Sequence, residues 1–330
     1  MRRHMLVLRA IAFSAAVIMA LAGAAQGKME RYEPKVILRL SWGDGPSDMG
    51  YAKDGPEDAE GLRYGPAAFD VDKDGSIYIL DSVQRQIKVF AQTGKLLKSF
   101  PVELRGDGSF CLDEKGNVWL NDGNRYTVRK YTPDGTPILT IEYGPGPSRA
   151  VDRRITIRGG EIYLGVSKVE VGQAKPVTGK RGERIYKATR RPLSREEEPR
   201  FIGRTSKRRY KSQEVRTGPD KIIMRDENGN SEEIYFDDIG TRDTVVFQSE
   251  DRYGNIYVEV CFYRGRGKVY SRQIWKYSPD LNLLAKVGPI PISDYTEIQK
   301  DVVVTDDGDI YYMYTEKTGV KVVKWSARSE

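Results

Sequence analysis

Three aspartates at alternating positions are the first residues in the sequence that could bind a metal. Asp70, Asp72 and Asp74 precede Gly75, and Asp81 occupies the twelfth position of the run. Carboxylates at this spacing, followed by a glycine that permits a sharp turn, match the pattern of a loop that binds Ca²⁺ through oxygen ligands. The twelfth position lacks Glu, however, and the same letters are ordinary in a turn between two strands. We therefore predict no metal site and no cofactor.

Histidine chemistry is excluded for the mature chain. The only histidine, His4, lies in an N-terminal segment that we expect to be removed on export. Without histidine the chain cannot form a Ser-His-Asp site, a histidine general base or a histidine metal site. We also find no nucleophile motif, so we predict no catalytic residues.

The largest charge anomaly lies between residues 179 and 216. This segment holds 14 Lys and Arg but only 5 Glu, whereas the rest of the chain after residue 24 is net acidic. Arg-rich clusters suit ligands that carry phosphate or carboxylate groups. The alternative is a solvated strand edge without a ligand. The candidate basic patch comprises Arg190, Arg191, Lys207, Arg208, Arg209 and Lys211.

A repeat of 41 residues supplies the elements that must position these side chains. Gly75 recurs as Gly116, and Phe90 recurs as Tyr131, both at an offset of 41. Each copy reads as four short strands separated by tight turns. A period near 40 that contains four strands is typical of a propeller blade. Because one blade cannot cover its own apolar face, several blades must stack in a ring.

The first copy of this motif resembles the NHL repeat. The resemblance rests on Gly65-Pro66, on the Asp-x-x-Gly turn that ends at Gly75, on the aromatic-aliphatic strand that ends at Asp81, and on the Ile-x-Val-Phe strand at 87–90. It implies a six-bladed β-propeller of the secreted bacterial type. It also implies recognition, since many NHL domains bind partners.

We predict an all-β fold, a six-bladed β-propeller of four-stranded blades. Residues 36–42 form an extra strand before blade 1, while blade 6 ends at Trp325 after three strands. The N-terminal strand should therefore close the ring as the fourth strand of blade 6, because an open edge exposes backbone donors and acceptors. In blade 3 we expect about eleven residues, inserted within 166–184, to delay the third strand. Blades 1, 2 and 3 are expected to begin near Gly65, Gly108 and Ile155. Blade 4 is expected around a hairpin at 221–236, and blades 5 and 6 are expected to begin near Val245 and Val302.

Residues 1–24 have the composition of a secretory signal peptide. Arg2, Arg3 and Arg9 precede an apolar stretch at 10–25, and a small-x-small cleavage site ends at Ala24. Residues 25–330 would then form a single NHL-like β-propeller domain without a transmembrane segment, periplasmic or secreted. Loss of the three arginines lowers the net charge from +7 to +4.

The two cysteines, Cys111 and Cys261, fall in different predicted blades. A disulfide requires Cα atoms within about 7 Å, so we expect none. Both thiols are expected to act as small buried side chains.

The two rims of the predicted ring differ in the length of their connections. Turns between first and second strands, and between third and fourth strands, are short and share one rim. The opposite rim carries longer connections such as 43–61, 143–152 and 262–271. Variable loops on a regular scaffold often carry binding, although they can also be tolerated insertions. The candidate ligand-binding residues there are of types favoured at interfaces: Trp42, Arg85, Arg125, Tyr126, Tyr263, Arg264, Arg266 and Tyr314.

These patterns predict a non-catalytic binding or scaffold module. The expected partner is a protein or an anionic glycan in the cell envelope or outside the cell, and nucleic acid is disfavoured by the compartment. The alternative is a metal-dependent hydrolase or lactonase of the gluconolactonase-like type, which holds its metal with Glu, Asn and Asp. That alternative requires acidic or amide residues on the inner strands. The predicted inner strands are mostly apolar, with Asp70 as the exception.

Overall fold

The computed structural model describes residues 29–53, 63–106, 108–145, 154–165, 167–173, 175–194, 197–198, 202, 206–213, 221–236, 243–264, 268–293 and 295–328. Every regular element in this part of the chain that spans more than one residue is a β-strand. The predicted signal peptide at 1–24 lies outside the described residues. Within those residues, no helix is long and apolar enough to cross a membrane.

The first copy of the repeat folds as four antiparallel strands that pair in chain order. The first three strands are almost wholly buried, whereas the fourth alternates between more and less buried positions and is buried only at Phe100. This gradient is expected when the first strand faces the centre of a ring and the fourth faces solvent. The strands are β4 (Pro66–Val71), β5 (Ile77–Asp81), β6 (Gln86–Phe90) and β7 (Leu96–Pro101).

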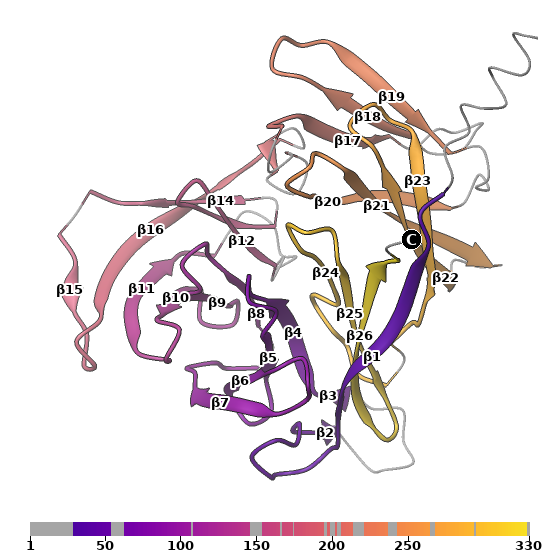
Figure 1. Ribbon diagram of the computed structural model, residues 1–330. Helices are drawn as coiled ribbons and strands as arrows, with labels where there is room; N and C mark the ends of the chain where they lie inside the picture. The colour runs from indigo at the N-terminus through magenta and orange to yellow at the C-terminus, as the bar shows by residue number, and fades with distance from the viewer. Residues whose placement is uncertain are drawn as a thin grey trace, which may run out of the picture.

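The second copy and the unit after it share one sheet of nine strands. The second copy repeats the antiparallel order of the first, and its last strand, β11, then pairs in parallel with β16. β15 and β16 project from the body of the molecule (Figure 1). The strands are β8 (Ser109–Leu112), β9 (Val118–Asp122), β10 (Thr127–Tyr131), β11 (Pro137–Tyr143), β12 (Ile155–Arg158), β13 (Glu161–Leu164), β14 (Ser167–Val171), β15 (Val177–Thr178) and β16 (Arg184–Pro192).

The expected delay of the third strand in this unit was wrong. β14 follows β13 after a tight turn, with Leu164 paired to Ser167. The extra residues lie between β14 and β16, where β15 pairs with the start of β16 and lengthens the hairpin. The sequence pattern misled us because β14 lacks the aromatic residue that marks the third strand elsewhere, while Tyr186 in β16 supplies one. The insertion therefore belongs to the rim of short turns.

A three-stranded sheet follows. It contains the predicted hairpin at 221–236, which is confirmed by the pairing of β18 with β19. β17 lies on the other side of β18, and Ile202 forms a β-bridge with Arg209 at the start of β17. The strands are β17 (Arg209–Gln213), β18 (Lys221–Arg225) and β19 (Ser231–Tyr235).

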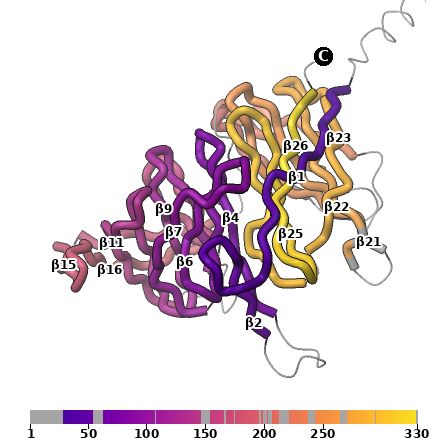
Figure 2. The backbone as a smooth tube through the Cα atoms, turned by 60° about the horizontal axis from the view of Figure 1, so that its bottom comes forward, coloured from indigo at the N-terminus to yellow at the C-terminus, as the bar shows by residue number. Residues whose placement is uncertain are grey.

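The N-terminal strand closes the last sheet, as predicted. β1 pairs antiparallel with β26 from Tyr32–Ala327 to Leu40–Val320, and the two strands run side by side in Figure 2. Glu30 extends this closure because its carboxylate lies 2.8 Å from Lys276 Nζ in the preceding sheet. The strands of the two sheets are β20 (Thr244–Glu250), β21 (Ile256–Arg264), β22 (Lys268–Tyr277) and β23 (Leu283–Ile290), then β24 (Val302–Val304), β25 (Ile310–Glu316), β26 (Gly319–Ala327) and β1 (Tyr32–Leu40); β2 (Ala52–Lys53) pairs with β3 (Arg63–Tyr64) beside them.

The sheets form a β-propeller. Strands β4, β8, β12, β20 and β24 lie nearest the common centre (Figure 1) and line a central cavity of about 2360 Å³. Apolar clusters fill the spaces between successive sheets; one of them joins β4–β7 to β8–β10. The count of six blades stays a prediction, because several residues on either side of β17 and the residues after β19 lie outside the described ranges.

Asp70 ties three sheets together at the centre. One carboxylate oxygen accepts the Leu112 N–H of β8 at 3.0 Å and lies 2.8 Å from Lys300 Nζ, in the connection before β24. Ala67 O also accepts the Gln299 N–H at 2.7 Å. The acidic side chain considered above as a metal ligand thus links neighbouring sheets.

Candidate ligand-binding face

The short-turn rim is built from one turn used repeatedly. In five sheets the residue that opens the turn donates its N–H to the carbonyl four residues later and accepts the N–H of the glycine three residues later. The glycines have φ between 75° and 86°, a region that favours glycine. They are Gly75, Gly116, Gly229, Gly254 and Gly308.

Side chains on this rim largely satisfy one another. Lys130 Nζ lies 4.6 Å from the ring centroid of Trp119 and 3.0 Å from the carboxylate of Asp113. Burial would raise the pKa of Asp113, but hydrogen bonds from Trp119, Asn117 and Lys130 outweigh it and lower that pKa to about 2. Asp72, from the aspartate run, accepts backbone N–H groups of its own turn. Similar Lys-over-ring contacts occur at Tyr257–Lys276 and Tyr311–Lys324.

The long-connection rim, made of turns between second and third strands and of links between sheets, uses different backbone chemistry. Arg85 and Tyr126, 41 residues apart, have φ of 57° and 53°. Their carbonyls accept the N–H groups of Val102 and Tyr143, each at 2.9 Å, which fixes both turns. A non-glycine residue in this region costs about 1 kcal/mol or more. Large side chains therefore occupy positions where glycine would be less strained.

A groove of about 660 Å³ opens beside the second of these turns, between β10, β11 and β16. Arg125 lies 3.9 Å from both Glu103 and Asp122, and its side chain is 45% exposed. Arg129 donates to Glu103 O at 3.2 Å. The groove is lined by Arg125, Tyr126, Thr127, Arg129, Glu142, Tyr143, Gly144, Lys187 and Ala188.

A further arginine lies behind this groove. The Arg190 guanidinium lies 5.5 Å from the ring centroid of Tyr143, and its Nη2 donates to Ser167 Oγ at 3.3 Å. Its Nε is buried without a hydrogen-bond acceptor. Tyr143 is fixed in turn because its hydroxyl donates to Asn121 Oδ1 at 2.7 Å. The Tyr143 wall of the groove and Arg190 behind it are therefore held in place.

Sequence reasoning placed two residues in this groove, Arg125 and Tyr126, and missed Arg129, Tyr143 and Lys187. The repeat offset could have identified Arg129, which corresponds to Lys88. Both cations donate to a carbonyl of the connection that precedes their own sheet. Both cations are also in ion pairs: Lys88 is fully buried against Asp81, and Arg129 pairs with Glu103 with its side chain 10% exposed.

Four other predicted ligand-binding residues lie elsewhere on the long-connection rim. Trp42 donates from Nε1 to Glu316 O at 3.1 Å. Tyr314 stacks on Tyr312, with ring centroids 5.9 Å apart. Tyr263 is half-buried at the end of β21, and Arg85 is exposed. The side chains of Arg264 and Arg266 lie outside the described residues.

The structure distributes the predicted basic patch over several sheets. Arg190 and Arg191 belong to β16, where Arg191 pairs with Glu170 and Glu197. Arg208 donates to Pro279 O at 3.0 Å, which links two sheets. Lys207 and Arg209 line the central cavity, and Lys211 lies in β17.

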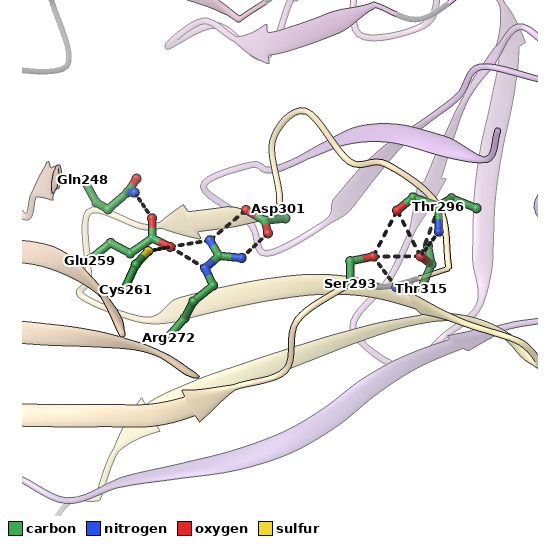
Figure 3. A network of polar contacts seen from close by, with 8 residues as sticks. All are labelled: Gln248, Glu259, Cys261, Arg272, Ser293, Thr296, Asp301 and Thr315. Atoms are coloured by element: carbon green, nitrogen blue, oxygen red, sulfur yellow. Dashed lines mark hydrogen bonds and ion pairs between the residues drawn. The ribbon is translucent and has the colours of Figure 1, made fainter. Parts of the chain in front are cut away.

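A buried polar network that sequence reasoning did not identify joins the last two sheets (Figure 3). Arg272 contacts the carboxylates of Glu259 and Asp301, and Gln248 donates to Glu259. Burial would lower the pKa of the Arg272 guanidinium, but Asp301 and Glu259 raise it above its ordinary value. Cys261 lies at the edge of this network. No pattern in the sequence around Cys261 predicts the network.

Both thiols are free, Cys111 in β8 and Cys261 in β21. Burial raises the pKa of each to about 12, with Glu259 adding to the effect at Cys261. Both are therefore protonated and poorly nucleophilic near neutral pH. Among the described residues no three His, Cys, Asp or Glu side chains gather as a metal site.

No family model and no curated protein sequence matches this chain. Solved structures do match. A DUF4221-family member from Bacteroides vulgatus is 10% identical, with 92% of this chain and 100% of that chain covered and a TM-score of 0.48. Virginiamycin B lyase from Staphylococcus aureus is 13% identical, with coverage of 85% and 100% and a TM-score of 0.45.

A gluconolactonase from Xanthomonas campestris is 11% identical, with coverage of 89% and 99% and a TM-score of 0.39. These neighbours have propeller-like folds and include a lyase, a lactonase and a protein without a stated activity. At these identities and TM-scores no activity transfers to this chain. Its fold as a β-propeller module rests on its own strand order.

Proposed function

We propose that this chain is an exported β-propeller that recognises an anionic ligand, an acidic protein surface or an anionic glycan, on its long-connection rim. The observation that carries the proposal is the groove between β10, β11 and β16. Three cationic side chains line it, those of Arg125, Arg129 and Lys187. Glu142 pairs with Lys187 and Glu103 pairs with Arg129, so Arg125 is the lining cation that lacks a carboxylate at hydrogen-bond distance. An exposed arginine beside tyrosines, such as Arg125, suits carboxylate, sulfate or phosphate groups.

The state of Arg125 favours a ligand over a closed structural contact. Its two carboxylate neighbours lie 3.9 Å away, beyond the length of a charge-assisted hydrogen bond. A bound anion could therefore gain short hydrogen bonds without breaking any. The left-handed backbone of Tyr126 supports the same conclusion, since strain of this kind persists mainly where a side chain is needed.

We infer in addition that the blades are of the NHL type and that residues 1–24 direct export to the periplasm or the medium. In four of the five repeated turns, an aromatic residue follows the glycine by three positions, as in Gly75 and Tyr78. The uncharged stretch at 10–25 supports export. N-terminal sequencing of protein purified from the envelope or the medium should begin near Ala25; an intact residue 1 would contradict export.

The test of recognition is a salt titration of binding to heparin oligosaccharide and to poly-glutamate. Removal of two groove charges, in Arg125→Ala/Lys187→Ala, should weaken binding about tenfold at low salt and flatten its salt dependence. The matched control, Lys73→Ala/Arg252→Ala, removes the same charge from the short-turn rim and should change binding little.

A third variant, Arg208→Ala/Arg209→Ala/Lys211→Ala, tests whether the basic segment contributes. Equal losses in both double variants would show that net charge alone governs binding and would overturn the groove. Unchanged binding in the groove variant would overturn it as well. Melting temperatures of all variants identify any loss that comes from unfolding.

No observation on the described residues favours the alternative function, that of a metal-dependent hydrolase. Asp70, the inner-strand carboxylate that it would use, already contacts Lys300 and the Leu112 N–H. Metal analysis of purified protein together with a lactonase screen tests this alternative directly.

A further inference from the structure

Three aromatic rings gather on the long-connection rim, away from the groove. Trp42 follows β1, Tyr51 precedes β2, and Tyr295 lies in the connection from β23 to β24. Tyr51 and Tyr295 are stacked at 5.3 Å between ring centroids, and Trp42 lies 5.5 Å and 5.9 Å from them. All three residues are half-buried, so none of them is fully enclosed by the protein.

The aromatic cluster lies beside the last sheet of the propeller and the connection that leads to it. Trp42 Nε1 donates to Glu316 O, while the hydroxyls of Thr296, Thr315 and Ser293 form the compact network of Figure 3. A Cβ at Gly65 would lie 3.1 Å from Thr296 and 3.3 Å from Trp42, so the backbone passes close to both. The rings are therefore fixed by packing and by hydrogen bonds before any ligand arrives.

One cation lies over this cluster. The guanidinium carbon of Arg63 is 4.8 Å from the ring centroid of Tyr295, and Arg63 is exposed at its place in β3. Fixed aromatic faces next to an exposed arginine can hold the apolar face of a ring and an anion attached to that ring at the same time.

We propose that Trp42, Tyr51, Tyr295 and Arg63 form a stacking platform for a glycan whose sugars carry carboxylates. This inference rests on the proposed function, because it selects the anionic glycan from the two ligand classes allowed there. The C–H face of a uronic acid residue lies against the solvent-accessible side of the aromatic cluster, and its carboxylate binds Arg63. A quaternary ammonium ligand is disfavoured because Arg63 places a positive charge over the rings.

The experiment measures binding of an oligogalacturonate, a neutral galactan of equal length and poly-glutamate by calorimetry. Tyr295→Ala and Arg63→Gln should each weaken oligogalacturonate binding about fivefold or more. Tyr295→Phe keeps the ring and should bind like the unchanged protein. Tyr253→Ala and Arg252→Gln are matched controls, because this pair forms a similar contact, 5.1 Å, on the short-turn rim.

The outcomes separate this inference from the proposed function. Loss in the groove variants but not in Tyr295→Ala or Arg63→Gln would leave anion recognition standing and overturn the platform. Poly-glutamate bound more tightly than oligogalacturonate would assign the rim to an acidic protein and overturn it too. No binding of either anion would contradict both proposals. Equal binding of the neutral galactan would show that Arg63 does not bind a sugar carboxylate, and it would overturn the platform as a site for charged sugars.

Discussion

Both rims of this propeller contain turns with a left-handed backbone position, but the residue types at these positions differ between the rims. The short-turn rim places glycine at most of its left-handed positions, such as Gly75 and Gly116, with Leu281 as an exception, and it pairs its charges locally. In the first two repeats the long-connection rim instead places Arg85 and Tyr126 at left-handed positions, and it leaves Arg125 nearly half exposed. In these two repeats the first rim therefore avoids backbone strain, while the second retains strain and places large polar side chains at the surface.

This difference shows how one repeat separates stability from recognition. The repeated turn is closed by its own hydrogen bonds, so substitutions there should change the free energy of unfolding. On the other rim, each connection packs differently, and the groove needs a strand from the next unit, β16, to complete it. Substitutions that face solvent there should change binding more than stability.

Both rims exist only if the ring is closed, so the largest expected effect is at β1. Leu38 and Leu40 point into an apolar cluster, 2% and 7% exposed, while Val36 on the same strand is 37% exposed. Leu38→Asp/Leu40→Asp should lower the melting temperature by more than about 10 °C or yield aggregates, because buried leucines contribute several kcal/mol each. Val36→Asp should change it little. Calorimetry and size-exclusion chromatography check this, and equal effects of both variants would contradict closure by β1.

The next-largest effect compares the stability contributed by a charged side chain between two sheets with that of a charged side chain on the surface. Arg272 contacts two carboxylates between sheets and its side chain is 15% exposed, whereas Arg252 on the short-turn rim is 59% exposed. Arg272→Ala should cost about 3–5 kcal/mol, because it leaves Glu259 and Asp301 without their cation. Arg252→Ala should cost about 1 kcal/mol or less. Urea unfolding measures both, and similar costs would show that the inward network does not hold the sheets together.

Much of the fold could be predicted because its signals are local. An aspartate or threonine that opens a turn, a glycine in that turn and an alternating strand suffice to identify the units that begin near Gly65, Gly108, Val245 and Val302. The closure by β1 followed from counting strands and from the cost of an open edge. The unit at Ile155 was not predicted correctly, because its third strand lacks the aromatic residue that marks this strand in the other units.

The candidate site could be predicted only in part, for a related reason. Arg125 and Tyr126 lie in a turn whose rim follows from the repeat. Lys187 reaches the groove because β16 pairs in parallel with β11, with Glu142 opposite Lys187. No sequence periodicity encodes a contact between the outer strands of two units. The network around Arg272 has the same origin, since it depends on packing between sheets.

Substitutions at residues with a left-handed backbone test the contrast between the two rims directly. Gly116→Ala should destabilise the fold by about 1 kcal/mol, because φ of 75° is strained for alanine. Arg85→Gly should stabilise it by roughly 0.5 kcal/mol, since relief of strain at φ of 57° exceeds the added freedom of the unfolded chain. Thermal unfolding of the two variants measures these opposite signs. Destabilisation by Arg85→Gly would mean that its side chain makes a structural contact, and the contrast between the rims would weaken.

The smallest effect concerns acid stability on the short-turn rim. The pKa of Asp113 is about 2 in the folded protein, below the ordinary value near 3.9 of an unfolded aspartate. The carboxylate therefore stabilises the fold above about pH 4, and this contribution is lost as the pH falls towards 2. Asp113→Asn should lower the melting temperature at pH 6, and its difference from the unchanged protein should shrink steadily between pH 4 and pH 2.5. Asp226→Asn is the control: Asp226 opens the same turn, and hydrogen bonds from Asn230 lower its pKa, but its described contacts include no tryptophan or lysine, so it should contribute less. If the Asp113 difference does not depend on pH, the turn carboxylate is not stabilised by Trp119 and Lys130, and the short-turn rim is less self-contained than its geometry indicates.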